Sequence, residues 1–132
     1  MNGEIDRWAH LDPYTSRYCR DLIRLYDEIE AMTTDIITIA NTYQFSVEEV
    51  TRAKDHAFGN GVSRYQFIPD LDMAEAWRRM ARGEGTSVDE VLLRHEILES
   101  ALILDRGITQ KEAHDIAQQR YPWSELLGEA NR

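Results

Sequence analysis

The chain has 132 residues, of which 24 are acidic and 15 are basic, giving a formal net charge of -9 at pH 7. This length suits a single hydrophobic core, and so negative a surface disfavours general binding to the phosphate backbone of nucleic acids. Cys19 is the only cysteine, which excludes an intrachain disulfide and a multi-cysteine metal site.

The sequence shows no sign of membrane insertion or secretion. No apolar run approaches the roughly 20 residues that span a bilayer, and the start MNGEIDRW lacks the basic and then apolar layout of a secretory signal. We therefore expect a single domain over residues 1–132, with no membrane partner and a cytoplasmic location.

Helical spacing of apolar residues dominates the first third of the chain. Asp12 followed by Pro13 is typical of a helix N-cap and first helical position. Apolar residues then recur at intervals of three or four. The pattern predicts a long N-terminal helix over residues 12–43, which Thr33 and Thr34 can break into two.

Local start and stop signals predict the other elements. Ser46, Ser87 and Thr109 each begin a stretch with capping-box spacing, Asp70 or Asp72 can cap another helix, and Gly107 is a typical helix end. The resulting helices cover residues 46–58, 70–83, 87–106 and 109–121, with a loop over residues 59–69.

The predicted fold class is all-α, because strand-like alternation of useful length is missing from the sequence. We expect a single-domain bundle of about five helices, with Trp77 as an anchor of its core. The short connection after Gly107 predicts that the last two helices form a C-terminal antiparallel pair.

Histidines and carboxylates on this helix pair form the main candidate site. His95 and Glu99 are four residues apart and share one helix face, with Glu96 on the adjoining face. An antiparallel return places His114 level with residues 99–101. We expect His95, Glu99 and His114 to meet at a partly accessible site, with Glu96 or His56 close enough to assist.

Three interpretations of this group remain open. His95, Glu99 and His114 can ligate zinc or another divalent metal while Glu96 activates a bound water, although the stretch reads HEILE and not HExxH. Without metal, the two histidines can act as acid and base. In the third interpretation, His95 bonds a carboxylate simply to join two helices. The candidate catalytic residues are His95, Glu96, Glu99, His114 and His56.

Other polar residues give weaker signals. The main basic group contains Arg78, Arg79, Arg82 and Arg94. Arg78 and Arg94 are candidate ligand-binding residues that can hold a phosphate, although a solvated helix face also explains such arginines. His56 lies near a helix end, where its protonated form favours the helix dipole without any functional role.

Four segments carry a resemblance to a known group of proteins: KDHAF, FIPDLDMAEAWRRMARG, LLRHEILES and AHDIAQQRYPW, in this order. From about Ile36 to Trp123 the chain resembles a small helical domain found at the C-termini of phage head-associated and polymorphic-toxin-like bacterial proteins. The matching positions are Lys54, His56, Phe58, Asp72, Trp77, Arg78, Gly83, His95, Glu96, Glu99, His114 and Tyr121. The resemblance implies an effector or toxin, but it carries over no settled reaction.

Two functional hypotheses follow. The first is a bacterial effector or toxin-like domain with a hydrolytic His and Glu site, for which nucleic acid is one candidate substrate. The alternative is a non-enzymatic helical interaction module, such as an acidic immunity or antitoxin protein. Its protein partner would be the cognate toxin or immunity protein.

Overall fold

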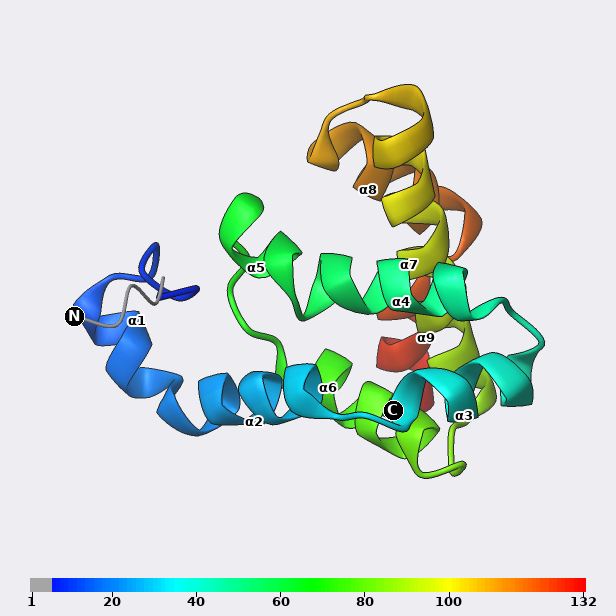
Figure 1. Cartoon of the computed structure of the whole chain (residues 1–132), viewed down its shortest axis with the longest axis horizontal. Coiled ribbons are helices and arrows are strands. Elements are labelled where there is room, and N and C mark those ends of the chain that lie inside the picture. Colours follow the sequence, from blue (N-terminus) through cyan, green and yellow to red (C-terminus); the bar gives the residue numbers. More distant parts are fainter. Residues whose placement is uncertain (1–5) are drawn as a thin grey trace.

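The computed structural model describes residues 6–132, and these residues form helices and connecting loops without a strand. Figure 1 shows their arrangement. The helices are α1 (Pro13–Tyr18), α2 (Arg20–Ala31), α3 (Asp35–Tyr43), α4 (Val47–Ala57), α5 (Asn60–Arg64), α6 (Leu71–Ala81), α7 (Ser87–Arg106), α8 (Gln110–Arg120) and α9 (Trp123–Ala130). The all-α prediction is confirmed. The predicted number of about five helices is wrong, since the described residues form nine.

The expected long N-terminal helix over residues 12–43 is divided into α1, α2 and α3. Asp12 caps α1 as predicted, by accepting a hydrogen bond from the backbone N–H of Thr15 at 2.8 Å. A first break falls at Cys19, and a second falls after Met32, whose ψ of 144° is extended. Thr34 is the N-cap residue of α3, so the second break lies where the threonine pair indicated it.

Side-chain caps fix the starts of several later helices. Ser46 and Glu49 form the complete predicted capping box at the start of α4, with both hydrogen bonds at 3.0 Å. Asp70 caps α6 by accepting from the N–H of Met73. Thr109 caps α8 by accepting from the N–H of Glu112 at 3.1 Å. These local bonds satisfy backbone donors that the first helical turn leaves free.

The capping box of α7 lies one residue earlier than the sequence predicted. Thr86 and Asp89 form it, not Ser87 and Glu90. Asp89 is buried and also accepts two hydrogen bonds from the guanidinium of Arg79, both at 2.8 Å. This bidentate ion pair links α6 to the start of α7.

Two helices lie where none was expected. The stretch 59–69, predicted to be a loop, contains α5, which packs closely on the end of α4 because residue 61 is glycine. A Cβ at Gly61 would come within 1.8 Å of the His56 carbonyl oxygen. Beyond Pro122 the chain resumes as α9, whose Trp123 is buried against a small apolar cluster beside α7.

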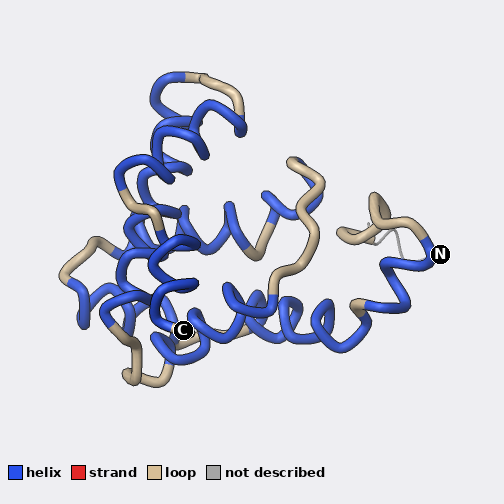
Figure 2. The backbone as a smooth tube through the Cα atoms, turned by 180° about the vertical axis from the view of Figure 1, so that it is seen from behind, coloured by secondary structure: helices blue, strands red, loops and turns tan. Residues whose placement is uncertain are grey.

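The main core lies where α2, α3, α4, α6 and α7 pack together, and the two views of the backbone show α7 crossing α4 (Figures 1 and 2). Trp77 is only 1% exposed, and its Nε1 donates to Asp35 Oδ2 at 2.9 Å. The same carboxylate oxygen pairs with the buried Lys54 ammonium at 2.8 Å.

None of the helices in residues 6–132 has the length and apolar character needed to cross a membrane.

We predict that Trp77→Ala lowers the free energy of unfolding by about 3 to 5 kcal/mol, because it leaves a large cavity and removes the hydrogen bond to Asp35. Chemical denaturation followed by circular dichroism measures the loss. Ile37→Ala is the control, since Ile37 is 57% exposed and its truncation should change stability by less than about 0.5 kcal/mol. Similar small losses for both variants would contradict the anchoring role of Trp77.

Candidate metal and acid-base site

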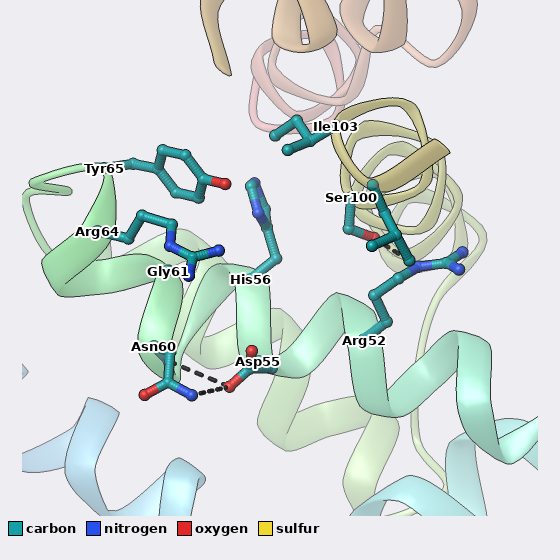
Figure 3. A pocket seen from close by; sticks show the side chains of 10 residues that line it. Arg52, Asp55, His56, Asn60, Gly61, Arg64, Tyr65, Ser100 and Ile103 are labelled. Atoms are coloured by element: carbon teal, nitrogen blue, oxygen red, sulfur yellow. Dashed lines mark hydrogen bonds between the residues drawn. The ribbon is translucent and has the colours of Figure 1, made fainter. Parts of the chain in front are cut away.

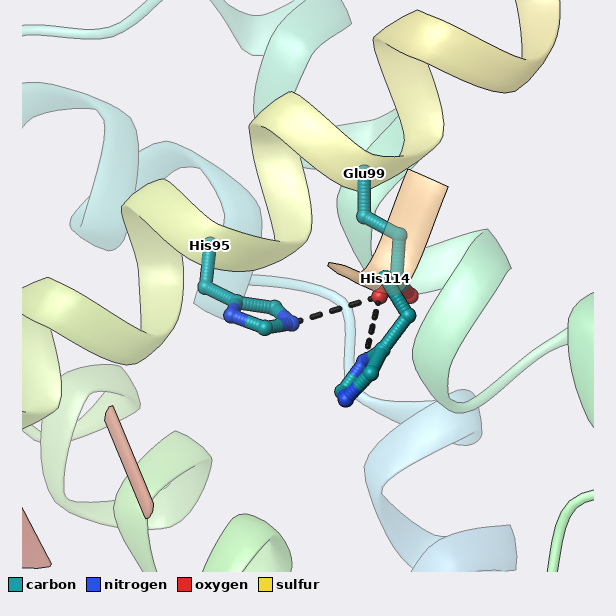
Figure 4. Close-up of side chains that lie close together, drawn as sticks. All are labelled: His95, Glu99 and His114. Carbon is teal, nitrogen blue, oxygen red and sulfur yellow. Dashed lines mark hydrogen bonds and ion pairs between the residues drawn. The ribbon is translucent and has the colours of Figure 1, made fainter. Parts of the chain in front are cut away.

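The Glu99 carboxylate lies at the centre of a group of three imidazoles. Its Oε1 is 3.2 Å from His95 Nε2 and 2.9 Å from His114 Nδ1, as Figure 4 shows. Its Oε2 is 2.7 Å from His56 Nε2. The Glu99 side chain is only 3% exposed, so these contacts replace the water that would otherwise solvate its charge.

Three helices position this group. His95, Glu96 and Glu99 belong to α7, His56 to the last turn of α4, and His114 to α8. Gly107 ends α7 with a positive φ of 63°, and the short connection returns α8 along α7, while α4 packs against α7 from another direction. The His95 and His114 ring centroids are consequently 5.1 Å apart. The structure thus brings together all five predicted candidate residues, and His56 contacts Glu99 directly.

The hydrogen bonds of His95 define its protonation. Its Nδ1 lies 3.1 Å from the Tyr121 carbonyl oxygen, which can only accept, so Nδ1 carries a hydrogen. A neutral His95 would then turn the lone pair of Nε2 toward Glu99 Oε1, which is also an acceptor. This contact requires a positive charge between the two atoms, supplied either by a proton or by a metal cation.

The pKa of His95 is raised above its usual value. Burial alone acts to lower this pKa, but the hydrogen bond to Glu99 and the negative charges of Glu96 and Glu99 outweigh it. In the metal-free protein, a proton on His95 Nε2 therefore supplies the positive charge that the contact requires.

The two glutamates of the site have opposite pKa shifts. Burial acts to raise the pKa of Glu99, but hydrogen bonds from His56, His95 and Gln110 hold it well below its usual range. Burial raises the pKa of Glu96 to about 7, and repulsion from Glu99 adds to this effect. Glu99 is therefore a permanent carboxylate, whereas Glu96 exchanges its proton near neutral pH.

A cavity of about 200 Å³ opens beside the two glutamates. Its polar lining includes Glu96, Glu99, Gln110 and His114, and its remaining walls are largely apolar. The side chain of His114 is 52% exposed, which gives solvent and small molecules access to the cluster. The arrangement meets the general form of a binding site, a partly apolar hollow with a few converging polar groups.

His56 borders a second pocket, of about 240 Å³ (Figure 3). Arg52 and Arg64 contribute positive charge to this pocket, and Tyr65 lies with its ring centroid 5.1 Å from that of His56. Arg52 donates its Nε to Ser100 Oγ at 3.3 Å. Asp55 also lines this pocket, and His56 therefore borders a pocket with two arginines and one aspartate while its Nε2 contacts the buried Glu99 carboxylate.

The two arginines predicted to bind a ligand do not line the cavity beside Glu96 and Glu99. Arg94 pairs with Glu90 at 3.0 Å and covers the ring of Phe45. Arg78 is exposed on α6 and borders a shallow pocket next to Thr34. Arg94 precedes His95 in the sequence, but its guanidinium is held by Glu90 and Phe45 and not by the cluster.

Within residues 6–132, two sets of side chains have the composition and spacing of metal ligands, and both include Glu99. One set is His95, Glu99 and His114, and the other is His56, Glu96 and Glu99. Within each set the potential ligand atoms lie within 4.8 Å of one another. Imidazole nitrogens with a carboxylate oxygen suit zinc and related divalent cations.

Sequence reasoning missed two contributors to the site. Gln110 donates its side-chain N–H to Glu99 Oε2 at 3.1 Å, and its spacing of four residues from His114 was the available signal. The Tyr121 carbonyl orients His95, and the signal was Pro122, which ends α8 close to this point.

Comparison with known proteins finds no matching family model, curated protein or solved structure.

The raised pKa of Glu96 predicts a pH-dependent stability in the metal-free protein. Below pH of about 4.5, Glu96 is neutral in both folded and unfolded chains. As pH rises toward 7, only the unfolded chain ionises this group, so stability is lost until the folded-state pKa of about 7 is passed. Glu96→Gln should escape this loss and gain roughly 3 kcal/mol relative to the native protein between pH 4.5 and 8.

Urea unfolding at pH 4.5 and at pH 8, in the presence of a chelator, measures the free energy of unfolding of the native protein and of Glu96→Gln. Glu125→Gln is the matched control because Glu125 is exposed on α9, and its effect should be equal at the two pH values. The interpretation of Glu96 is wrong if Glu96→Gln also changes stability equally at both.

Proposed function

We propose that this chain is a hydrolytic domain of the effector or toxin-like class, in which His95, Glu99 and His114 hold a divalent cation. The observation that carries the proposal is the contact between His95 Nε2 and Glu99 Oε1, which needs a positive charge between its atoms. A divalent cation satisfies this need and simultaneously ligates His114 Nδ1, which is 2.9 Å from the same oxygen.

The surroundings of His95 support ligation of a cation by its Nε2. Metal-binding histidines commonly donate their second ring N–H to a carbonyl or carboxylate, which fixes the ring and its tautomer. The contact of His95 Nδ1 with the Tyr121 carbonyl, at 3.1 Å, has this form. Three protein ligands leave a coordination position for water, as in catalytic zinc sites.

The chemistry supported by this arrangement is hydrolysis by an activated water. A bound divalent cation lowers the pKa of a water molecule. Glu96 lies beside Glu99 in the lining of the cavity, and its proton exchange near neutral pH suits it to accept the proton that the attacking water loses. The same carboxyl group can return that proton to the leaving group, so the reaction consumes one water and restores the site.

The interaction-module hypothesis has an observation of its own. Tyr14 and Tyr18 stack on one face of α1 with ring centroids 6.1 Å apart, and they are 69% and 78% exposed. Exposed tyrosine rings are typical of protein contact surfaces. We retain as the second candidate a non-enzymatic module that binds a protein partner.

We predict that zinc raises the melting temperature of the native protein and that His95→Ala abolishes the rise. At a zinc concentration about 100 times the dissociation constant, binding to the folded state contributes about 2.7 kcal/mol. His10→Gln serves as the control, because His10 contacts the Phe67 carbonyl and lies outside both ligand sets. An equal zinc effect in native protein and His95→Ala would remove the metal from the proposal.

We also predict that expression of the native chain arrests bacterial growth and that His95→Ala and His114→Ala relieve the arrest while remaining folded by circular dichroism. In vitro, the zinc-loaded native chain should hydrolyse bis(p-nitrophenyl) phosphate or p-nitrophenyl acetate at least 100-fold faster than either variant. Tyr14→Ala should leave growth arrest and hydrolysis unchanged. Loss of growth arrest only in Tyr14→Ala, without hydrolysis by any chain, would instead support the interaction module.

A further inference from the structure

Glu99 presents its two carboxylate oxygens to different partners. His95 and His114 contact Oε1, whereas His56 and Gln110 contact Oε2. We propose that the cluster is a two-cation centre in which Glu99 bridges two divalent ions, the second held by His56, Glu96 and Glu99 Oε2. This inference rests on the proposed function, because it presupposes the first cation at His95 and His114.

The second position has the same close spacing of potential ligand atoms as the first. His56, Glu96 and Glu99 each offer one ligand atom within 4.8 Å of the other two. All three side chains are buried, so the surrounding helices already restrict their motion. A carboxylate that gives one oxygen to each ion is compatible with the separation of about 3.5 to 4 Å found in two-metal catalytic sites.

The packing of His56 favours this second position. Its ring lies between Tyr65 and Phe67, with centroid distances of 5.1 and 5.6 Å. These contacts hold the imidazole with Nε2 directed at Glu99 Oε2, 2.7 Å away. A ligand held in one orientation before binding loses less conformational freedom when it coordinates an ion.

Gln110 supplies an independent observation at the same place. Its amide N–H contacts Glu99 Oε2, but its own Oε1 is buried and has no hydrogen-bond partner among the described residues. A buried acceptor without a partner is costly. A cation or its bound water beside Oε2 provides a partner for this oxygen, whereas the first cation position on Oε1 faces the two other histidines.

The charge of a two-cation centre indicates the class of substrate. Glu96 and Glu99 balance half of the charge of two divalent ions, so the centre remains positive and attracts an anion. Paired cations stabilise both the attacking and the leaving oxygen in phosphoester hydrolysis. Arg52 and Arg64 line the pocket beside His56 together with the single acidic residue Asp55, so this pocket carries a net positive formal charge. The substrate class is therefore a phosphate ester.

Occupation of the second position also changes the role of Glu96. With one cation, its carboxylate is free to accept the proton of the attacking water. With two cations it becomes a ligand, and a water between the ions is activated by both of them.

The test is a titration of the metal-free full chain with Mn²⁺, which combines equilibrium dialysis with electron paramagnetic resonance. We expect two Mn²⁺ per chain, and the six-line signal of the first ion should weaken at least several-fold as the second binds, because a shared carboxylate couples the spins. Glu96→Gln, which keeps the side-chain shape, should bind one Mn²⁺ with an uncoupled signal. His56→Phe, which keeps the aromatic packing, should do the same. His10→Gln should retain two coupled ions.

The outcomes separate this inference from the proposed function. One Mn²⁺ per native chain, with hydrolysis of bis(p-nitrophenyl) phosphate retained, would overturn the two-cation centre and leave the single-cation function intact. Two uncoupled ions that persist in both Glu96→Gln and His56→Phe would place the second ion elsewhere on this acidic chain and overturn the inference. If the native chain binds no Mn²⁺, or if His95→Ala binds Mn²⁺ as the native chain does, both the two-cation centre and the proposed function would be overturned.

Discussion

The buried charge of Glu99 is the constraint on which the arrangement of α4, α7 and α8 depends. A carboxylate that is 3% exposed must be compensated by hydrogen-bond donors or cations. His56, His95 and His114 provide this compensation from three different helices. A shift of α4 or α8 along α7 would leave the charge without part of its compensation, so the cluster and the helix packing stabilise each other.

The same stretch of α7 is unusual for a central helix because four of its five buried positions carry polar groups, Ile97 being the exception. His95, Glu96, Glu99 and Ser100 are all buried. Replacing such groups with apolar residues commonly leaves stability unchanged or improves it, so packing alone does not account for them. Opposite pKa shifts on two neighbouring carboxyl groups, beside a cavity, are typical of sites that move protons or hold cations. The polar interior of α7 therefore supports the proposed cation site at Glu99.

The sequence predicts those features that depend on neighbouring residues along the chain. Ser46 with Glu49, Asp70 and Thr109 identify helix starts because capping is local. His95, Glu99 and His114 could be brought together from one helical repeat and one short turn. The break at Cys19, the short helix α5 and the helix after Pro122 had no comparable local signal, because their positions depend on packing against distant residues. Together with the break at the threonine pair, which the sequence indicated, they explain the change from about five helices to nine.

The candidate site shows the same division between local and tertiary information. The contact of His56 with Glu99 joins residues 43 positions apart and follows from the crossing of α4 and α7, which spacing cannot reveal. Arg78 and Arg94 were attractive as phosphate ligands from their charge alone. Their directions in the fold take them to other surfaces, and Arg52 and Arg64 are the arginines that lie near the cluster.

The most direct test of a metal centre at Glu99 is anomalous diffraction from crystals of the zinc-loaded protein. We expect a zinc peak within about 2.0 to 2.2 Å of His95 Nε2, His114 Nδ1 and Glu99 Oε1, with His95 Nδ1 still bonded to the Tyr121 carbonyl. A cluster that keeps its imidazole to carboxylate hydrogen bonds and shows no anomalous peak, in crystals soaked at saturating zinc, would contradict it.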